Sequence, residues 1–279
     1  MSYPQVRYNT VTLDRRLSAN LWRNSLDEYA DGHPEIGSFD FCDFVGRDAV
    51  GNTSDAAAQS GWFVQDAAAG GTNENFANVA SPDGIAVLSA STGTDHFGIE
   101  AHRGYSATTG AWVNLPTHAT DARGRVVFET YVDFDESDNW FIGLTEAIVE
   151  FLSATGTLPT ASDYIGFYRA DDGDLKFVCA NDNDGGTAVT DSITIIAAAD
   201  APTGLQKVGF AVNKDNSVEI CVAGDLIKLD TSGVTIVVDE DALPIETLTQ
   251  KYATTRGATG DLAAVALRVD WCACFVAAG

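Results

Sequence analysis

Short segments in which apolar and polar residues alternate cover most of the chain after Ile36. Alternation with a period of two is typical of β-strands that bury one face. The pattern predicts strands at residues 38–45, 61–65, 84–90, 95–102, 125–134, 139–144, 163–169, 175–180, 192–196, 206–212, 217–222, 226–229, 234–238 and 265–276. Strands this numerous, separated by Gly-, Asp- and Asn-rich turns, predict an all-β fold, an antiparallel β-sandwich.

The last predicted strand, 265–276, has the clearest alternation. We expect one face to lie in the core, and it carries Val265, Leu267, Val269, Trp271, Ala273 and Phe275. The opposite face carries Arg268, Asp270, Cys272 and Cys274, and we expect it to be half-covered. The long connections are weakly patterned, and two short helices are expected within them, at 146–152 and 244–248.

Residues 13–29 have a different period. Apolar residues recur there every three to five positions, which predicts an amphipathic helix, and the sequence 30–34 then ends it. We therefore divide the chain into an N-terminal helical arm, 1–35, and a sandwich domain, 36–279. A single helix cannot cover its own apolar face, so it packs on its own domain, on another subunit or on another protein.

Charge separates the same two parts. The chain has 16 Lys and Arg against 40 Asp and Glu, a net charge of -24, so no nucleic-acid partner is expected for the main body. Residues 1–26 are nevertheless basic. The residues expected to bind a capsid or a subunit are Arg7, Arg15, Arg16, Leu17, Leu21, Trp22, Arg23 and Leu26. No apolar run approaches the 18 residues or so that a membrane-spanning helix needs, and no secretory signal is evident, so no membrane partner is expected.

The side chains that carry chemistry form no convincing constellation. Glu129 and Asp133 share one face of a predicted strand, but the third carboxylate of a laminarinase-like motif is missing at position 131, so we expect a solvated face. His96, Glu100 and His102 also share a face, but His96 lies about 13 Å from Glu100, too far for one metal. The acidic loops lack a twelve-residue calcium spacing. We expect no catalytic residue, no metal and no cofactor, and hence no enzyme.

The sequence also predicts the burial of the cysteines and the exposure of one tryptophan. The five cysteines are Cys42, Cys179, Cys221, Cys272 and Cys274; they lie in strand-like contexts and are expected to be buried, reduced thiols. Trp112 lies in a long Gly- and Thr-rich connection and is the best candidate for an exposed aromatic ring that stacks on a glycan.

Eight short motifs follow one another in a recognisable order. They are DFVG at 43–46, GWFV at 61–64, GIAVLS at 84–89, RVVFETYV at 125–132, WFIGLTE at 140–146, DYIGFY at 163–168, LKFVCAND at 175–182 and ALRVDW at 266–271. In order and spacing this series resembles tailed-phage virion structural proteins with a concanavalin-like, jelly-roll sandwich. The resemblance covers roughly residues 38–276 and does not include the predicted helix.

The resemblance implies a capsid decoration, or cement, protein that stabilises the phage head. It would be made in the host cytoplasm, lie on the capsid surface of the virion, and dock through its N-terminal arm. Its expected partners are the major capsid protein and itself, as a homotrimer, the trimer following from the symmetry of shells. The alternative is a lectin-like tail or head-fibre module that binds host glycans.

Overall fold

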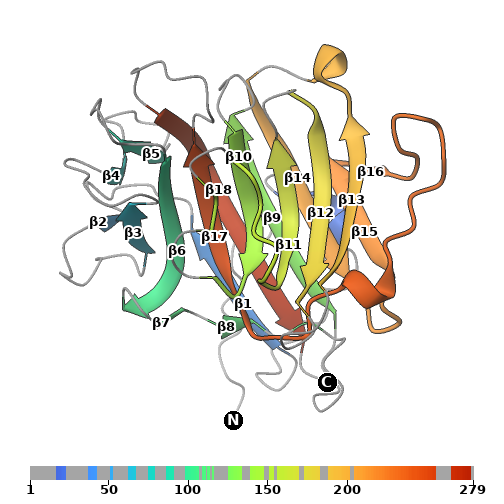
Figure 1. Ribbon diagram of the computed structural model, residues 1–279, viewed down its shortest axis with the longest axis horizontal. Helices are drawn as coiled ribbons and strands as arrows, with labels where there is room; N and C mark the ends of the chain where they lie inside the picture. The colour runs from blue at the N-terminus through green and yellow to red at the C-terminus, as the bar shows by residue number, and fades with distance from the viewer. Residues whose placement is uncertain are drawn as a thin grey trace, which may run out of the picture.

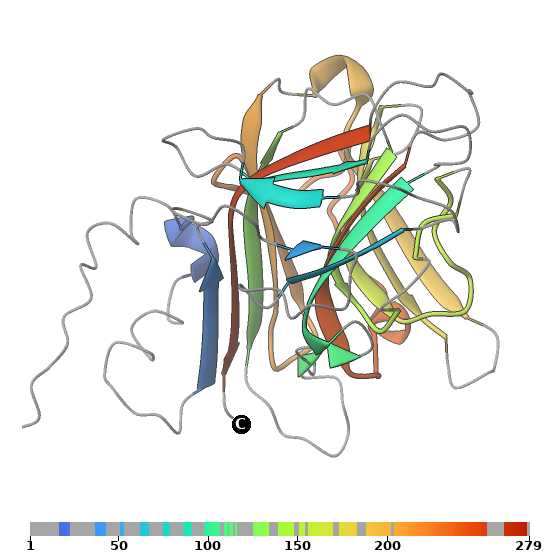
Figure 2. The same cartoon turned by 90° about the vertical axis from the view of Figure 1, so that its left-hand side faces the viewer.

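The computed structural model describes the chain in segments. These are residues 17–22, 37–42, 51–52, 62–66, 75–78, 86–90, 98–106, 109–110, 112–113, 115, 125–133, 139–147, 151–153, 156–169, 173–182, 188–201, 204–255 and 265–277. Among them, every paired strand is antiparallel to its neighbours, and the strands form two sheets, A and B. Figure 1 shows the strands side by side across the molecule, and Figure 2 shows the two layers edge-on.

Sheet A contains β9, β14 and β18 at its centre. Its spatial order is β16 (Asp225–Ile227), β15 (Val218–Val222), β14 (Leu205–Val212), β9 (Val126–Asp133), β18 (Val265–Ala277), β5 (Ala86–Ala90), β4 (Asn75–Asn78) and β2 (Gly51–Asn52). The N-terminal strand β1 (Gly37–Cys42) pairs with the C-terminal half of β18.

Sheet B has β10 and β17 at its centre. Its spatial order is β13 (Val189–Ile196), β12 (Leu175–Asn181), β11 (Tyr164–Arg169), β10 (Asn139–Thr145), β17 (Leu248–Thr255), β6 (Gly98–Ser106) and β3 (Trp62–Asp66). Two short strands are attached to it, β7 (Thr109–Gly110) on β6 and β8 (Trp112–Val113) on β17. The antiparallel sandwich predicted from the alternation is thus confirmed.

An aromatic cluster joins the sheets in the core. Phe128 and Phe210 come from sheet A, and Phe167 and Phe177 come from sheet B. The ring centroids of Phe177 and Phe210 lie 5.7 Å apart across the two layers, and those of Phe128 and Phe210 lie 5.5 Å apart within sheet A. All four side chains are almost fully buried. Each of these residues lies in a segment that the sequence predicted as a strand.

The predicted faces of β18 are correct only for its first half. The register with β9 shifts between Val269 and Trp271, which marks a β-bulge, and an extra residue reverses the alternation that follows it. Leu267 and Val269 lie in the core between the sheets, but beyond the bulge Cys272 and Cys274 take that place. Trp271, Ala273 and Phe275 face the outside of sheet A, where other segments bury them.

Helical structure is scarce among the described residues. It comprises one turn, α2 (Ala19–Trp22), and two 3-10 turns, η2 (Ala198–Asp200) and η3 (Glu240–Ala242). The amphipathic helix predicted at 13–29 is therefore supported only at 19–22, and the rest of it lies outside the described residues. The helix predicted at 244–248 is wrong, because this stretch leads into β17. No helix in the described part of the chain is long and apolar enough to cross a membrane.

Candidate functional site

The N-terminal turn packs on the outer face of sheet A. Leu17, Leu21 and Trp22 are at most 3% exposed, and α2 lies against β14, β15 and β16. Gly209 on β14 makes room for it, since a Cβ there would lie 2.7 Å from a methyl carbon of Leu21. The ring of Trp22 meets that of Phe39 on β1 edge-on at 5.8 Å. Figure 2 shows α2 and β1, both in blue, together beside β18.

This packing changes the interpretation of the N-terminal arm. Three of the eight expected docking residues, Leu17, Leu21 and Trp22, are used by the chain's own sheet and are not available to a partner in this conformation. Of the three packing modes open to the helix, these residues adopt the first, packing on their own domain. The other five expected residues lie outside the described part of the chain; they are Arg7, Arg15, Arg16, Arg23 and Leu26.

Glu129 is buried beneath the N-terminal turn. Its Oε2 accepts a hydrogen bond from the Ser18 backbone N–H at 3.0 Å and from the Trp22 indole N–H at 2.6 Å. Burial raises the pKa of Glu129, although the hydrogen bonds from Ser18 and Trp22 act in the opposite direction. Position 129 was expected on a solvated face, and that expectation is wrong because the turn covers it.

Glu129 and Asp133 do not form a hydrolytic pair. Glu129 is committed to the hydrogen bonds from Ser18 and Trp22 beneath the N-terminal turn. Asp133 is also buried and lies 3.4 Å from the guanidinium of Arg268. Glu129 therefore holds the N-terminal turn on sheet A, and Asp133 links β9 to β18.

The outer face of sheet B carries a buried ion pair. Lys251 Nζ on β17 lies 2.6 Å from Glu100 Oε2 on β6, and the two side chains are 0% and 1% exposed. Glu100 Oε1 also accepts the Leu152 backbone N–H at 2.9 Å, so the segment around Leu152 crosses over the pair. Burial lowers the pKa of Lys251, and the charge of Glu100 opposes that shift. Sequence reasoning missed Lys251, although the chain has only five lysines and this one adjoins an aromatic residue.

Glu100 and His102, which share a strand face, are each engaged by another side chain. His102 stacks on Phe63 with 5.7 Å between ring centroids, and Glu100 is paired with Lys251. Within the described segments, no group of three His, Cys, Asp or Glu side chains has the arrangement to hold a metal ion. His96 lies outside them.

Asp163 is another buried acid, and sequence reasoning missed it. Its Oδ1 accepts the Asp182 N–H at 2.7 Å, and its Oδ2 accepts the N–H groups of Ile245 and Glu246 at 2.7 and 2.9 Å. The carboxylate thus ties the start of β11 to the end of β12 and to the approach to β17. Burial is the main cause that raises the pKa of the adjacent Glu146, and Asp163 and other acids nearby add to it.

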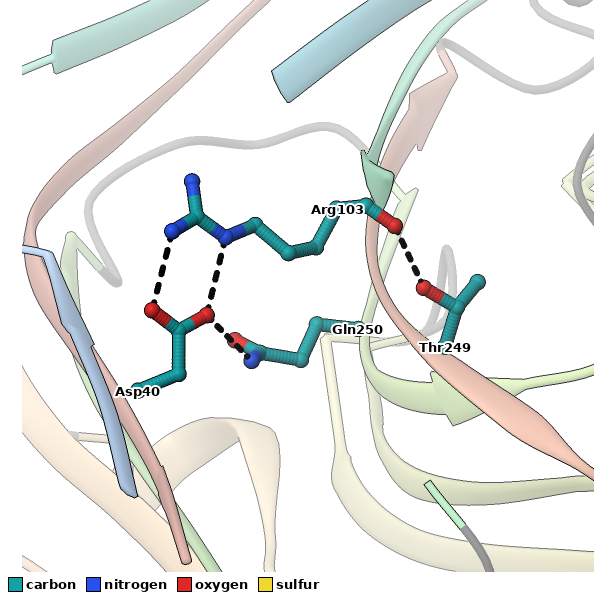
Figure 3. A network of polar contacts seen from close by, with 4 residues as sticks. All are labelled: Asp40, Arg103, Thr249 and Gln250. Carbon is teal, nitrogen blue, oxygen red and sulfur yellow. Dashed lines mark hydrogen bonds and ion pairs between the residues drawn. The ribbon is translucent and has the colours of Figure 1, made fainter. Parts of the chain in front are cut away.

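Another group of polar side chains, partly buried, joins the two sheets (Figure 3). Arg103 on β6 forms two hydrogen bonds with Asp40 on β1, from Nε to Oδ2 at 2.8 Å and from Nη2 to Oδ1 at 2.9 Å. Gln250 on β17 donates to the same Oδ2 at 3.2 Å, and Thr249 donates to the Arg103 carbonyl at 2.6 Å. Arg103 also lies over the Trp62 ring, 5.8 Å from its centroid.

One segment of the surface exposes large apolar side chains. Leu229, Val234 and Val237 are 51%, 60% and 77% exposed, and they belong to residues 228–238, which we call the edge hairpin. The edge hairpin continues from β16 of sheet A, and its Thr231 N–H donates to Thr194 O on β13 of sheet B at 3.2 Å. It was predicted as a strand at 234–238, but a single bridge, Leu229 to Thr235, is the only pairing it makes.

The edge hairpin is held firmly and is surrounded by acids. Asp230 Oδ1 accepts the Ser232 and Val234 N–H groups at 2.8 Å each, and Ile236 donates to Lys228 O at 2.9 Å. Residues 225–241 contain five acids and one lysine. Exposed apolar side chains on an ordered segment that carries these acids are suited to a partner surface that is apolar and basic.

Two other tryptophans lie in the core, whereas the surroundings of Trp112 are only partly described. Trp62 and Trp140 are fully buried. Trp112 begins β8, paired with Thr249 of β17, while its side chain lies outside the described part of the structure. The glycan role of Trp112 remains a prediction.

Comparison with known proteins concerns the fold alone. No protein-family model matches the sequence, and no curated protein matches it. Among solved structures, the chain is similar to the Bacillus licheniformis beta-glucanase, with 14% identity, a TM-score of 0.47, and 87% of this chain and 99% of that one covered. It is also similar to a pseudo beta-1,3-glucanase of Mycobacterium tuberculosis, with 12% identity and a TM-score of 0.47; the match covers 84% of this chain and 99% of that one. A Shewanella oneidensis protein described as of unknown function is similar as well, with 10% identity and a TM-score of 0.47; the match covers 99% of this chain and 97% of that one.

The two antiparallel sheets confirm the predicted jelly-roll, concanavalin-like sandwich, and the comparisons correct one prediction. The prediction that the chain is not an enzyme is contradicted, since the solved structures to which it is similar include proteins named as glucanases and glycoside hydrolases. At this low identity the likeness assigns no reaction and no substrate to the chain.

Proposed function

We propose that the chain is a structural protein of a tailed-phage particle that decorates the head and binds the major capsid protein through the edge hairpin. The observation that carries this proposal is the exposure of three large apolar side chains, Leu229, Val234 and Val237, on the ordered edge hairpin. The ordered series of motifs, with its resemblance to virion structural proteins, supplies the identity of the partner. Among the described residues, the chain itself occupies the outer faces beneath α2 and beneath Leu152, whereas the apolar side chains of the edge hairpin are exposed.

Charge supports the same partner surface. The chain carries a net charge of -24, so a second copy would bring acid against acid at the edge hairpin. A capsid surface with Lys or Arg around an apolar depression would instead be attracted. Attachment should therefore weaken as salt rises, and self-association as a homotrimer would use other surfaces.

The test starts from purified particles of the source phage. Hundreds of copies of the chain relative to the major capsid protein would support decoration of the head, and a handful would move the chain to the tail. In a rebinding assay with capsids stripped of the chain, we expect Leu229→Ser with Val237→Ser to weaken binding at least tenfold, since each buried side chain contributes about 1.5 to 3 kcal/mol. Thr235→Ser on the same hairpin is the control and should bind as the wild type.

The same preparation decides between this role and action on glycans. It is incubated with barley β-glucan and laminarin, and both binding and newly formed reducing ends are measured. Saturable binding, or release of reducing ends that continues with time, would displace the decoration role. The Leu229/Val237 variant should be indistinguishable from wild type in these sugar assays.

A further inference from the structure

Two cysteines far apart in the sequence lie directly opposite each other in the structure. Cys42 ends β1 and pairs in register with Cys272 of β18. Directly opposed residues of antiparallel strands have Cα atoms about 4.5 to 5.5 Å apart, which lies within the range of about 4.4 to 6.8 Å found for disulfides. Both side chains point into the core between the sheets and are 5% and 2% exposed. Neither cysteine is part of a disulfide in the structure.

The thiol groups are close enough to interact. A hydrogen bond between the Cys42 and Cys272 side chains helps to raise the pKa of Cys272. The charge of Arg103 interacts with both thiol groups. Burial is the main cause that raises the pKa of Cys272, whereas the Arg103 cation acts in the opposite direction. A nearby cation favours the thiolate that thiol–disulfide exchange requires.

The other cysteines do not compete for the same partner. Cys274 faces the core two residues along β18, but its register partner is Asp40, and the diagonal distance to Cys42 is about 7 to 8 Å. Cys221 lies on the opposite face of sheet A, beneath α2, and Cys179 lies in sheet B. A metal is not favoured among the inward-facing groups, because Arg103 already binds Asp40.

We propose that Cys42 and Cys272 form a reversible disulfide that fastens β1 to β18 under oxidising conditions. The oxidant is a low-molecular-weight disulfide such as oxidised glutathione. The Cys42 thiolate attacks one sulfur of that disulfide and releases a first thiol; Cys272 then attacks the mixed disulfide and releases a second. Two protein thiols are oxidised, one small disulfide is reduced to two thiols, and the two protons from the cysteines end on those thiols.

The position of the pair gives the cross-link a structural consequence. β1 carries Asp40, which binds Arg103 on the opposite sheet, and Phe39, which packs on Trp22 of α2. A bond at Cys42 therefore fixes the strand on which both contacts depend. Because Cys42 is the last residue of β1, fraying of the strand end gives the oxidant access. The cross-link requires no attachment to a particle and stands apart from the decoration role.

The test uses the full chain, purified in reduced form and incubated in glutathione buffers from fully reduced to mainly oxidised. The protein is then denatured in acid to stop exchange, free thiols are alkylated in denaturant, and the mass is measured by mass spectrometry. We expect two of the five cysteines to escape alkylation, a digest in which one peptide pair joins Cys42 to Cys272, and full reversal by dithiothreitol. The oxidised form should melt about 5 °C or more above the reduced form.

Variants define which pair reacts. Cys274→Ser should retain the cross-link, and Cys42→Ser should abolish it and leave four alkylated cysteines. Five alkylated cysteines in the most oxidising buffer, a cross-link between any other pair, or a stable glutathione adduct would each overturn the proposal. Equal melting temperatures of the two forms would overturn its structural consequence. Peptide mapping of the wild type decides the pairing even where a variant fails to fold.

Discussion

Trp22 and Glu129 are 107 positions apart, yet the indole N–H of Trp22 donates to Glu129 Oε2 at 2.6 Å. Ser18 donates its backbone N–H to the same oxygen. A carboxylate on a central strand of sheet A thus fixes the N-terminal turn on the sheet. Its burial raises its pKa, which shows that desolvation outweighs the two hydrogen bonds.

Replacement of Glu129 separates charge from hydrogen bonding. Glu129→Ala leaves two buried donors unpaired and should lower the free energy of unfolding by about 2 to 4 kcal/mol. Glu129→Gln keeps an oxygen that can accept from Trp22 and should cost less. Urea denaturation followed by tryptophan fluorescence measures both. Equal losses for the two variants would contradict a hydrogen-bonding role for this side chain.

The raised pKa of Glu129 also predicts a pH dependence. A group whose pKa is higher in the folded state binds protons more readily when folded, so its contribution to stability is complete below the unfolded-state pKa. That contribution is lost as the pH rises through the folded-state pKa. The stability of Glu129→Gln minus that of the wild type should therefore increase from about pH 4 upward and then level off. Denaturation curves from pH 4 to 8 give this difference, and a flat difference would be inconsistent with a raised pKa.

The buried pair of Lys251 and Glu100 should behave as a unit. Lys251→Met leaves an unpaired buried carboxylate and should destabilise the fold by about 3 to 5 kcal/mol. The double variant with Glu100→Gln removes both charges and should recover most of this loss. Thermal or urea unfolding of the two single variants and the double variant yields the coupling energy. Lys228→Met, at an exposed position, is the control; additive losses at 100 and 251 would show that the two charges act independently.

The fold was predictable wherever alternation reflects burial. Strand β17 was not predicted, because its sequence, LTQKYATT, is mostly polar although all eight residues are buried. Its polar groups bond to residues far away in the chain: Lys251 to Glu100, Gln250 to Asp40, and Thr254 to the Asn139 carbonyl. Such partners are invisible to a pattern that counts only apolar positions.

The candidate site was less predictable than the fold. In the edge hairpin, Val234 and Val237 resemble strand residues in the sequence, but the segment lies across the gap between two sheet edges and buries mainly Ile236 and Val238. In β18, the bulge before Trp271 exchanged the faces, so Cys272 points inward toward Cys42. Both outcomes depend on tertiary position, which a local pattern does not contain.

Close contact between β10 and β11 depends on two glycines. Gly143 and Gly166 are register partners, and a Cβ on Gly143 would collide with Ile165 O and with the Gly166 Cα. Gly143→Ala should force the central strands of sheet B apart and cost about 3 kcal/mol or more. Gly233→Ala is the matched control; its φ of +78° carries strain of about 1 to 2 kcal/mol, but no atom lies within 4 Å. Similar losses at both positions, measured by thermal unfolding, would contradict the close approach.

The Asp40–Arg103 pair predicts a dependence on geometry as well as charge. Arg103 binds both oxygens of Asp40, and lysine cannot reproduce two parallel hydrogen bonds. Arg103→Lys should therefore cost about 1 to 2 kcal/mol although the charge is kept, and Asp40→Asn should cost a similar amount. Because Asp40 belongs to β1, hydrogen exchange at the β1 amides should accelerate in both variants, while exchange in β11 and β12 stays unchanged. If Arg103→Lys left β1 exchange at the wild-type rate, charge alone would account for the contact, and the paired geometry would not be what holds β1 to sheet B.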